Sequence, residues 1–280
     1  MIEVKKGKDY LNLFENISEL SRYVNRERKP GRCNSSDEED YGFYGTKNFN
    51  EALELLKYGD EKLYEKVKEE RAKIKIDNLL GKASNKRVYF NNVCGYIPNV
   101  PNYLIGSPLS MIDMKKVESS QRIVNIFLNI RVCGGVDAND VIKIGTKYLS
   151  VIDLIEKSGY RCNLYSGVAN ASGYTDRHSC LMTRIKTDRE PLNIKKICFA
   201  VANPSMQRRI KFRWQEVNDD SHDFSHDGYG GPENQSYIEE LLERELGEKF
   251  IIWNYESNNK SKPIEEIVKD LKNYGININI

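Results

Sequence analysis

The spacing of apolar residues alternates between a strand pattern and a helix pattern along the second half of the chain. Residues 122–132 form a nearly continuous apolar, β-branched run, which is typical of a strand covered on both faces. Apolar positions at helical spacing follow, after a helix start at Asp137, Asn139 or Asp140 and before Gly159, which is suited to end a helix. A second strand is expected at residues 160–165. This order predicts a βαβ unit with a right-handed crossover.

The same alternation continues to the last residue. Further strands are expected at residues 179–187, 210–217, 249–255 and 276–280, and further helices at residues 192–202, 236–246 and 264–274. A chain that alternates in this way favours an α/β fold: a mostly parallel or mixed sheet flanked by helices, with a von Willebrand A-like or Rossmann-like core. We place this α/β domain at residues 121–280.

The first 120 residues have a different pattern and are predicted to form an α-rich N-terminal region. Helical spacing predicts helices at residues 10–24, 50–58 and 60–80, the last with a mostly solvated surface, and a strand at residues 86–93. A segment dense in Pro and Gly follows, with apolar side chains between the breakers. We expect it to be a rigid loop packed onto the body, or the wall of a ligand site, and its candidate partner-binding residues are Tyr96, Ile97, Tyr103 and Leu104.

Composition narrows the possible functions. The chain carries 43 basic and 41 acidic residues, a net charge of +2, and this gives no strong field for nucleic acid or an anionic membrane. No run of about 18 apolar residues is present, and the N-terminus lacks the apolar core of a signal peptide. The six cysteines are scattered without a CxxC pair, which favours buried free thiols in a reducing cytoplasm.

Two segments contain side chains suited to chemistry. The first is a polar loop rich in His and Asp, in which a divalent metal would be held by Asp219, His222, Asp223, His226 and Asp227; the alternative is a solvated loop. This metal is the only cofactor that the sequence suggests. The second segment interleaves cations with Phe212 and Trp214, as in surfaces that bind nucleic acid or phosphate, and its cations are Arg208, Arg209, Lys211 and Arg213. Its alternative is a strand with the aromatic rings inside and the cations outside.

Asp176, Arg177 and His178 place an acid beside a base. Neighbouring residues of a strand point to opposite faces, so this pair would need a turn to act together. No nucleophile accompanies it, and we therefore assign no catalytic residue.

Three resemblances to known families follow from short motifs. The order of elements from Arg122 to Val217 resembles a von Willebrand A-type domain, which holds magnesium through Asp-x-Ser-x-Ser after its first strand. The aligned positions here are Asn129, Arg131 and Cys133, so the resemblance implies the topology without the metal ligands. The stretch from Gly42 to Gly59 resembles the opening of ADP-ribosyltransferase folds, with Tyr44 where those carry a histidine and no matching serine or glutamate motif.

The third resemblance extends over most of the chain from Gly42 onward. Several phrases together resemble an uncharacterised protein family encoded by bacteriophages and prophages: residues 42–59, 96–112, 145–160 and 204–209. The resemblance implies a viral source and no assigned activity.

The leading hypothesis is therefore a phage-encoded, non-enzymatic protein that acts in the cytoplasm of a bacterial host by binding a protein partner. That partner would be a host, defence or phage protein. The alternative is a metal-dependent enzyme that acts on nucleic acid or nucleotides through the loop of His222 and His226. Plain nucleic-acid binding without chemistry is a third hypothesis.

Overall fold

A computed structural model describes residues 1–28, 34–73, 87–116, 122–172, 177–218, 229, 231–255 and 263–276. The strands are β1 (Ile2–Lys6), β2 (Asp9–Phe14), β3 (Arg87–Asn92), β4 (Ile97–Pro98), β5 (Met111–Lys116), β6 (Ile123–Asn129), β7 (Arg161–Ala171), β8 (His178–Lys186), β9 (Gly231–Pro232) and β10 (Ile251–Asn254). The helices are α1 (Ile17–Val24), α2 (Tyr41–Tyr44), α3 (Phe49–Tyr58), α4 (Glu61–Ala72), α5 (Val100–Leu104), α6 (Ala138–Lys157), α7 (Ile194–Ala202), α8 (Phe212–Val217), α9 (Gln235–Leu246) and α10 (Ile264–Asp270). Shorter helical turns are Ser35–Asp37, the π-helical Met206–Lys211 and Leu271–Tyr274.

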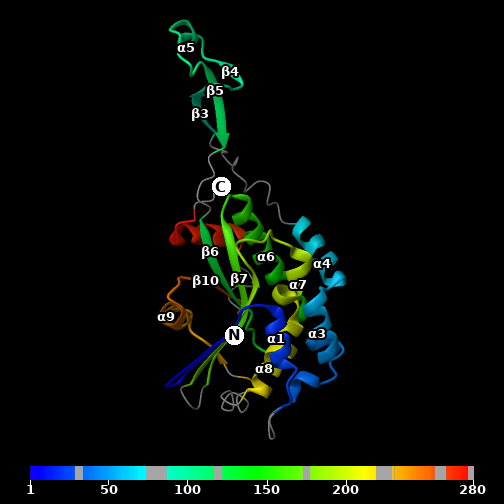
Figure 1. The fold of residues 1–280 in the computed structure, drawn as a ribbon. Helices are drawn as coiled ribbons and strands as arrows, with labels where there is room; N and C mark the ends of the chain where they lie inside the picture. Colours follow the sequence, from blue (N-terminus) through cyan, green and yellow to red (C-terminus); the bar gives the residue numbers. More distant parts are fainter. Residues whose placement is uncertain are drawn as a thin grey trace.

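The large sheet is mixed, as the alternation of elements predicts. Its order is β1-β2-β8-β7-β6-β10, and β9 pairs with the end of β7. The pairs β2–β8, β6–β7 and β6–β10 are parallel, whereas β1–β2, β7–β8 and β7–β9 are antiparallel. The fold is therefore the predicted α/β class, with helices on both faces of the sheet (Figure 1).

The helices cover the two faces of the sheet unequally. Helices α1, α3, α4, α6 and α7 share the larger apolar core with one face, whereas α9 covers the other face (Figure 1). Alternating side chains of β6 explain the division: Ile126 and Leu128 point into the larger core, and Phe127 points toward α9.

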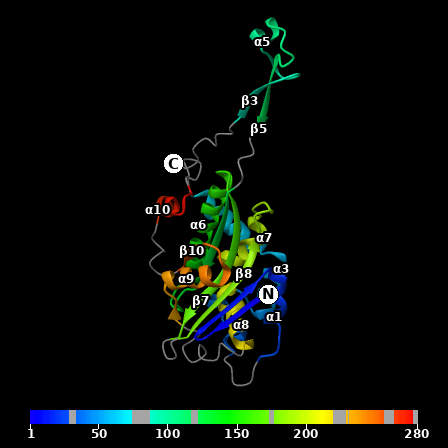
Figure 2. The same cartoon turned by 60° about the vertical axis from the view of Figure 1, so that its left-hand side comes forward.

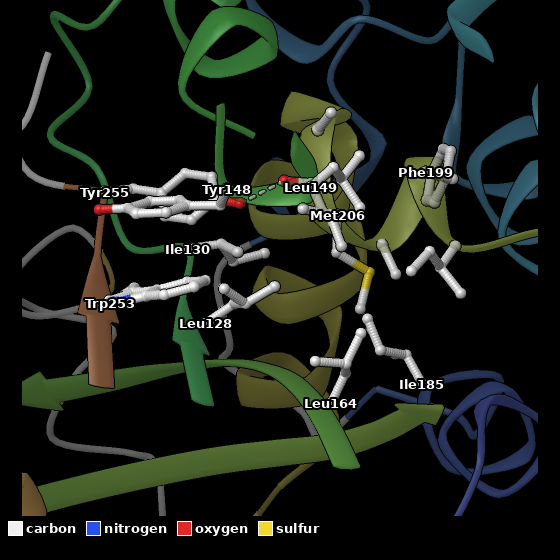
Figure 3. Close-up of a cluster of buried hydrophobic side chains, with 14 of the residues drawn as sticks. Leu128, Ile130, Tyr148, Leu149, Leu164, Ile185, Phe199, Met206, Trp253 and Tyr255 are labelled. Carbon is white, nitrogen blue, oxygen red and sulfur yellow. Dashed lines mark hydrogen bonds between the residues drawn. The ribbon is translucent and has the colours of Figure 1, made fainter. Parts of the chain in front are cut away.

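Aromatic side chains attach strand β10 to helix α6. The ring of Tyr148 stacks on Trp253 with centroids 4.9 Å apart, and its hydroxyl donates to the backbone oxygen of Asn254 at 3.0 Å. Figure 3 shows these rings beside Leu128 and Ile130. The hydroxyl of Tyr255 reaches α7, where it donates to the backbone oxygen of Val201 at 2.8 Å. Each buried phenol thus has a hydrogen-bond partner, which offsets the cost of its burial.

The N-terminal residues differ from their sequence pattern. Residues 10–24 were predicted to form one helix, but residues 9–14 form strand β2 and the helix begins only at Ile17, after the capping side chain of Asn16. Strand β2 lies inside the large sheet, where it pairs with β1 and β8, so pairing outweighs the helical spacing of its apolar residues. Sheet and core thus join residues before and after position 121, and the domain boundary placed there stays a prediction.

Candidate protein-binding surface

Residues 87–116 form a small unit of their own, which Figures 1 and 2 show standing apart from the large sheet. We call it the projecting unit. It is a three-stranded antiparallel sheet in the order β3-β5-β4, and the short helix α5 lies between β4 and β5. Asparagine side chains hold its turns. The Asn99 side chain caps α5 by accepting from the backbone N–H of Asn102, and the Asn102 side-chain amide donates to the backbone oxygen of Leu109 at 3.0 Å. Polar contacts of this kind order the loop without a large core.

The projecting unit exposes most of its apolar side chains. No side chain of residues 89–114 is buried. Tyr96 and Leu104 are each 77 % exposed, Tyr103 is 71 % exposed and Ile105 is 79 % exposed. The other exposed large apolar residues of the unit are Tyr89, Phe90, Val93, Ile97, Val100 and Leu109. An apolar cluster of this size on one small element is characteristic of a surface that contacts another molecule.

Most of the unit also lacks charge. Residues 88–112 contain no Asp, Glu, Lys or Arg, although charged residues make up 30 % of the whole chain. A solvated loop would normally carry charges, so the exposed surface of this unit suits an uncharged, apolar partner.

The predicted packing of this proline-rich segment onto the body is wrong for the described residues. The sequence pattern identified the apolar side chains correctly, but it could not show that they would be exposed rather than packed against the large sheet. Tyr96, Ile97, Tyr103 and Leu104, the four predicted partner-binding residues, all lie on the exposed surface of the unit. Whether they bind a partner stays a prediction.

The predicted phosphate-binding cations lie in a different setting. Residues 210–217 were predicted to form a strand, but Met206–Lys211 and Phe212–Val217 are helical, and this prediction is wrong. Arg208, Arg209 and Lys211 are 2 %, 0 % and 1 % exposed. The cations therefore face inward, the reverse of the alternative that placed them on the outside of a strand. Binding of phosphate by these residues stays a prediction, and this arrangement offers it almost no surface.

The two arginines bind the backbone of distant segments. Arg208 donates to the backbone oxygens of Phe43 at 2.6 Å and Val136 at 2.5 Å. Arg209 donates to the backbone oxygens of Ser36 at 2.8 Å and Thr46 at 2.8 Å. Burial lowers the pKa of both guanidinium groups from its usual value. The pair thus fastens residues 36–47 and the turn before α6 to the π-helical turn.

Arg213 pairs with acids instead. It contacts Asp37 at 2.6 Å and the buried carboxylate of Glu216 at 3.4 Å. Glu216 also accepts from the backbone N–H of Ser36 at 2.9 Å and from the hydroxyl of Tyr229 at 2.8 Å. The buried charge of Glu216 is therefore compensated by several donors, as such a group requires.

The positions aligned with the von Willebrand A metal motif are structural here. Asn129 is 2 % exposed; its side-chain oxygen accepts from the backbone N–H of Ala169 at 3.2 Å, and its amide donates to Asn254 at 2.8 Å. Asn129 thus links the ends of β6, β7 and β10. Cys133 is exposed in the turn before α6.

The predicted metal loop, with Asp219, His222, Asp223, His226 and Asp227, lies outside the described residues. No group of three or more His, Cys, Asp or Glu side chains suited to a metal occurs within the part of the chain that the structure describes. Asp176 is also outside it, so its pairing with His178 stays untested. His178 instead contacts the carboxylate of Glu233 through Nδ1 and stacks on the ring of Tyr237 at 4.1 Å. No local sequence signal indicates this contact, because Glu233 lies 55 residues away.

The cysteines follow the prediction in part. Cys162, Cys180 and Cys198 are buried and free, whereas Cys94 and Cys133 are exposed. Cys33 lies outside the described residues. Among the described helices, none is both long and apolar enough to cross a membrane.

A family model described as a domain of unknown function, DUF7192, matches residues 2–276. The chain belongs to this family. The match confirms the prediction of an uncharacterised family. No curated protein and no solved structure matches the chain. Because the family description assigns no activity, the function has to be argued from the residues themselves.

Proposed function

We propose that this protein acts by binding another protein, and that the projecting unit is its binding surface. The observation that supports this most directly is the exposure of ten large apolar side chains on residues 89–109, within a stretch that contains no charge from residue 88 to residue 112. Exposure of so much apolar surface to water is unfavourable. Burial of this surface against a complementary protein surface lowers the free energy.

The size of the unit supports the same proposal. A domain below about 40 residues usually needs a disulfide, a metal or association with another chain to be stable. The unit comprises 30 residues, from 87 to 116, and its Cys94 is a free, exposed thiol. Association with a partner protein would therefore also stabilise the folded structure of the unit.

The partner is proposed to be a protein with an uncharged, apolar surface, because residues 88–112 of the unit offer no charge to recognise an acidic or basic one. Its prominent side chains, Tyr96, Tyr103, Leu104 and Ile105, are of the aromatic and aliphatic kinds that anchor protein interfaces. The resemblance to a phage-encoded family supports a phage source and a host, defence or phage protein as partner, met in the cytoplasm of a bacterial host. The resemblance to von Willebrand A-type domains supports binding over catalysis, since Asn129 is fully engaged in structural hydrogen bonds.

Photo-crosslinking in bacterial cells tests the proposal. A photoreactive phenylalanine analogue would replace Tyr103 in one variant and Tyr58 in the other. Tyr58 is the matched control, because it is 85 % exposed on α3 of the body. We expect a discrete crosslinked protein from position 103 alone, and its loss when Leu104→Asp is added.

The crosslinked protein would then be purified and its affinity measured. Leu104→Asp should weaken binding by at least about tenfold, whereas Tyr58→Asp should leave it unchanged. Equal crosslinking from both positions would contradict the proposal. So would flotation with uncharged phosphatidylcholine vesicles in place of a protein crosslink, because it would assign the surface to a membrane.

A further inference from the structure

A second feature of the molecule is a pocket of about 580 Å³ among α2, α3, α4, α6 and the end of α7, and no residue of the projecting unit lines it. Its volume lies within the range of about 300–1,000 Å³ that small-molecule sites occupy. These elements come from three stretches that are far apart in sequence, and Arg208 joins two of them, since it donates to the backbone oxygens of Phe43 in α2 and of Val136 just before α6. The pocket is therefore a fixed part of the fold.

The inner wall of the pocket is a buried polar pair. Asp60 and Asn203 are 8 % and 6 % exposed, and the amide nitrogen of Asn203 donates to the Asp60 carboxylate at 3.1 Å. The other Asp60 oxygen accepts from the backbone N–H of Leu63 at 2.9 Å. A carboxylate has about four acceptor positions, so Asp60 can still accept a hydrogen bond from a hydroxyl or amino group in the pocket.

Two cations on α4 line the same pocket. Lys62 and Lys66 lie four residues apart, so they are neighbours on one face of the helix. Within the described residues neither ammonium group has a carboxylate partner. The pocket's two glutamates are engaged elsewhere, because Glu61 pairs with Lys195 and Glu51 accepts from the backbone N–H of Lys47. The two lysines thus give the pocket ammonium groups that can contact an anion, beside the carboxylates of Asp60 and Glu51, which accept from uncharged N–H donors.

The rest of the lining is apolar or aromatic. Leu55, Ile142 and Pro204 give it apolar surface, and Tyr41 adds a ring that is 64 % exposed. Gly45 leaves room where a side chain would meet Pro204, since an added Cβ would lie 2.8 Å from the Pro204 ring. The lining therefore offers a flat ring in addition to its two ammonium groups.

We propose that this pocket binds a nucleotide. Lys62 and Lys66 contact the phosphate, the Tyr41 ring stacks on the base, and Asp60 accepts a hydrogen bond from a sugar hydroxyl or a base amino group. This combination of a planar ring, hydroxyl donors and an anion in one small molecule matches the three kinds of side chain present. The site is separate from the projecting unit and does not depend on the function proposed for it.

Calorimetric titration of the full chain with AMP, GMP, CMP and UMP tests the proposal, with inorganic phosphate and the matching nucleosides as further probes. At least one nucleotide should bind more tightly than phosphate or its nucleoside, and added salt should weaken it. The double variant Lys62→Gln/Lys66→Gln and the variant Tyr41→Ala should each lower its affinity by about tenfold or more.

Lys68→Gln is the matched control, because Lys68 lies on α4 outside the pocket and pairs with Glu65 at 3.3 Å. The substituted side chains are exposed, so circular dichroism should show an unchanged fold. Absence of binding by all four nucleotides overturns the proposal. Phosphate binding as tight as nucleotide binding, or nucleotide binding that survives the double substitution, overturns it as well.

Discussion

The guanidinium group of Arg209 lies 4.2 Å from the centre of the Tyr44 ring, and Arg209 also donates to the side-chain oxygen of Thr46 at 2.9 Å. These contacts cross more than 160 positions of sequence, and they join the turn after α2 to the π-helical turn. A segment with little regular structure, residues 34–47, is thereby held in the core by a buried cation.

Arg209→Met should destabilise the protein strongly. The substitution keeps much of the apolar stem but removes the donors to Ser36, Thr46 and Lys47, whose carbonyl oxygens would lose a buried partner. A loss on the order of 3–5 kcal/mol in the free energy of unfolding is expected. Urea denaturation measures it, with Arg189→Met as the exposed control. Similar losses in the two variants would show that the Arg209 contacts contribute little.

Gly145→Ala should also destabilise the protein, although alanine is the better helix former. An added Cβ at Gly145 would lie 2.7 Å from the Cα of Ala202, so α6 and α7 would have to move apart. Overpacking of this kind costs about 1–3 kcal/mol, against a propensity gain of about 1 kcal/mol. Thermal unfolding should show a lower midpoint.

The matched control for that substitution is Gly134→Ala. An added Cβ there meets no atom within 4 Å, and the stability should hardly change. An unchanged or raised midpoint for Gly145→Ala would mean that the two helices separate at little cost.

The sequence predicted the second half of the fold well because local and tertiary signals agree there. The apolar run before Asn129, the helix between Asp137 and Gly159 and the helix ended by Gly247 all have the predicted type. The predictions for the residues of strand β2 and helix α8 were wrong for a shared reason: partners distant in sequence decide the conformation of these residues. Strand β2 pairs with β8, about 170 residues later, and α8 places Trp214 over Asn12, to which its indole N–H donates at 2.9 Å.

The candidate sites were predicted less completely than the fold. Sequence pattern found the apolar side chains of the projecting unit, but it did not show that they would be exposed. The pocket was missed because its lining comes from five separate segments, among which Asp60 and Asn203 meet only in the folded chain. The run of cations around Arg208 was predicted to be an exposed phosphate-binding surface. The sequence cannot show that backbone oxygens elsewhere in the chain accept hydrogen bonds from these cations.

Thiol labelling should divide the described cysteines into two groups. Burial raises the pKa of Cys162 and Cys180 to about 12 and that of Cys198 to about 11, so these thiols stay protonated and covered at neutral pH. Cys94 and Cys133 are exposed and should react quickly with iodoacetamide. Peptide mass spectrometry of the native protein checks this pattern. Rapid labelling of Cys180 without denaturant would show that the sheet opens locally.

Lys211 should make the stability depend on pH in a characteristic direction. Burial lowers its pKa to about 7, and its ammonium nitrogen lies 3.3 Å from the backbone oxygen of Ser166. An unfolded lysine has a pKa of about 10.4, so between these values the unfolded chain holds a proton that the folded chain lacks. The free energy of unfolding should therefore rise with pH above about 7. Below that value the folded protein bears the full cost of burying a charged ammonium group.

Lys211→Met removes the penalty, and the variant should be more stable than the parent at neutral pH. Its advantage should shrink by about 1 kcal/mol per pH unit as the pH rises from about 7 to about 8.5, because the two proteins share their other titrating groups. Chemical denaturation at several pH values measures the difference. Lys196→Met, on an exposed position of α7, is the control and should show no such slope. A pH-independent difference between parent and Lys211→Met would mean that Lys211 keeps an ordinary pKa in the folded protein, and hence that a further hydrogen-bond acceptor or water, besides the Ser166 oxygen, reaches its buried nitrogen.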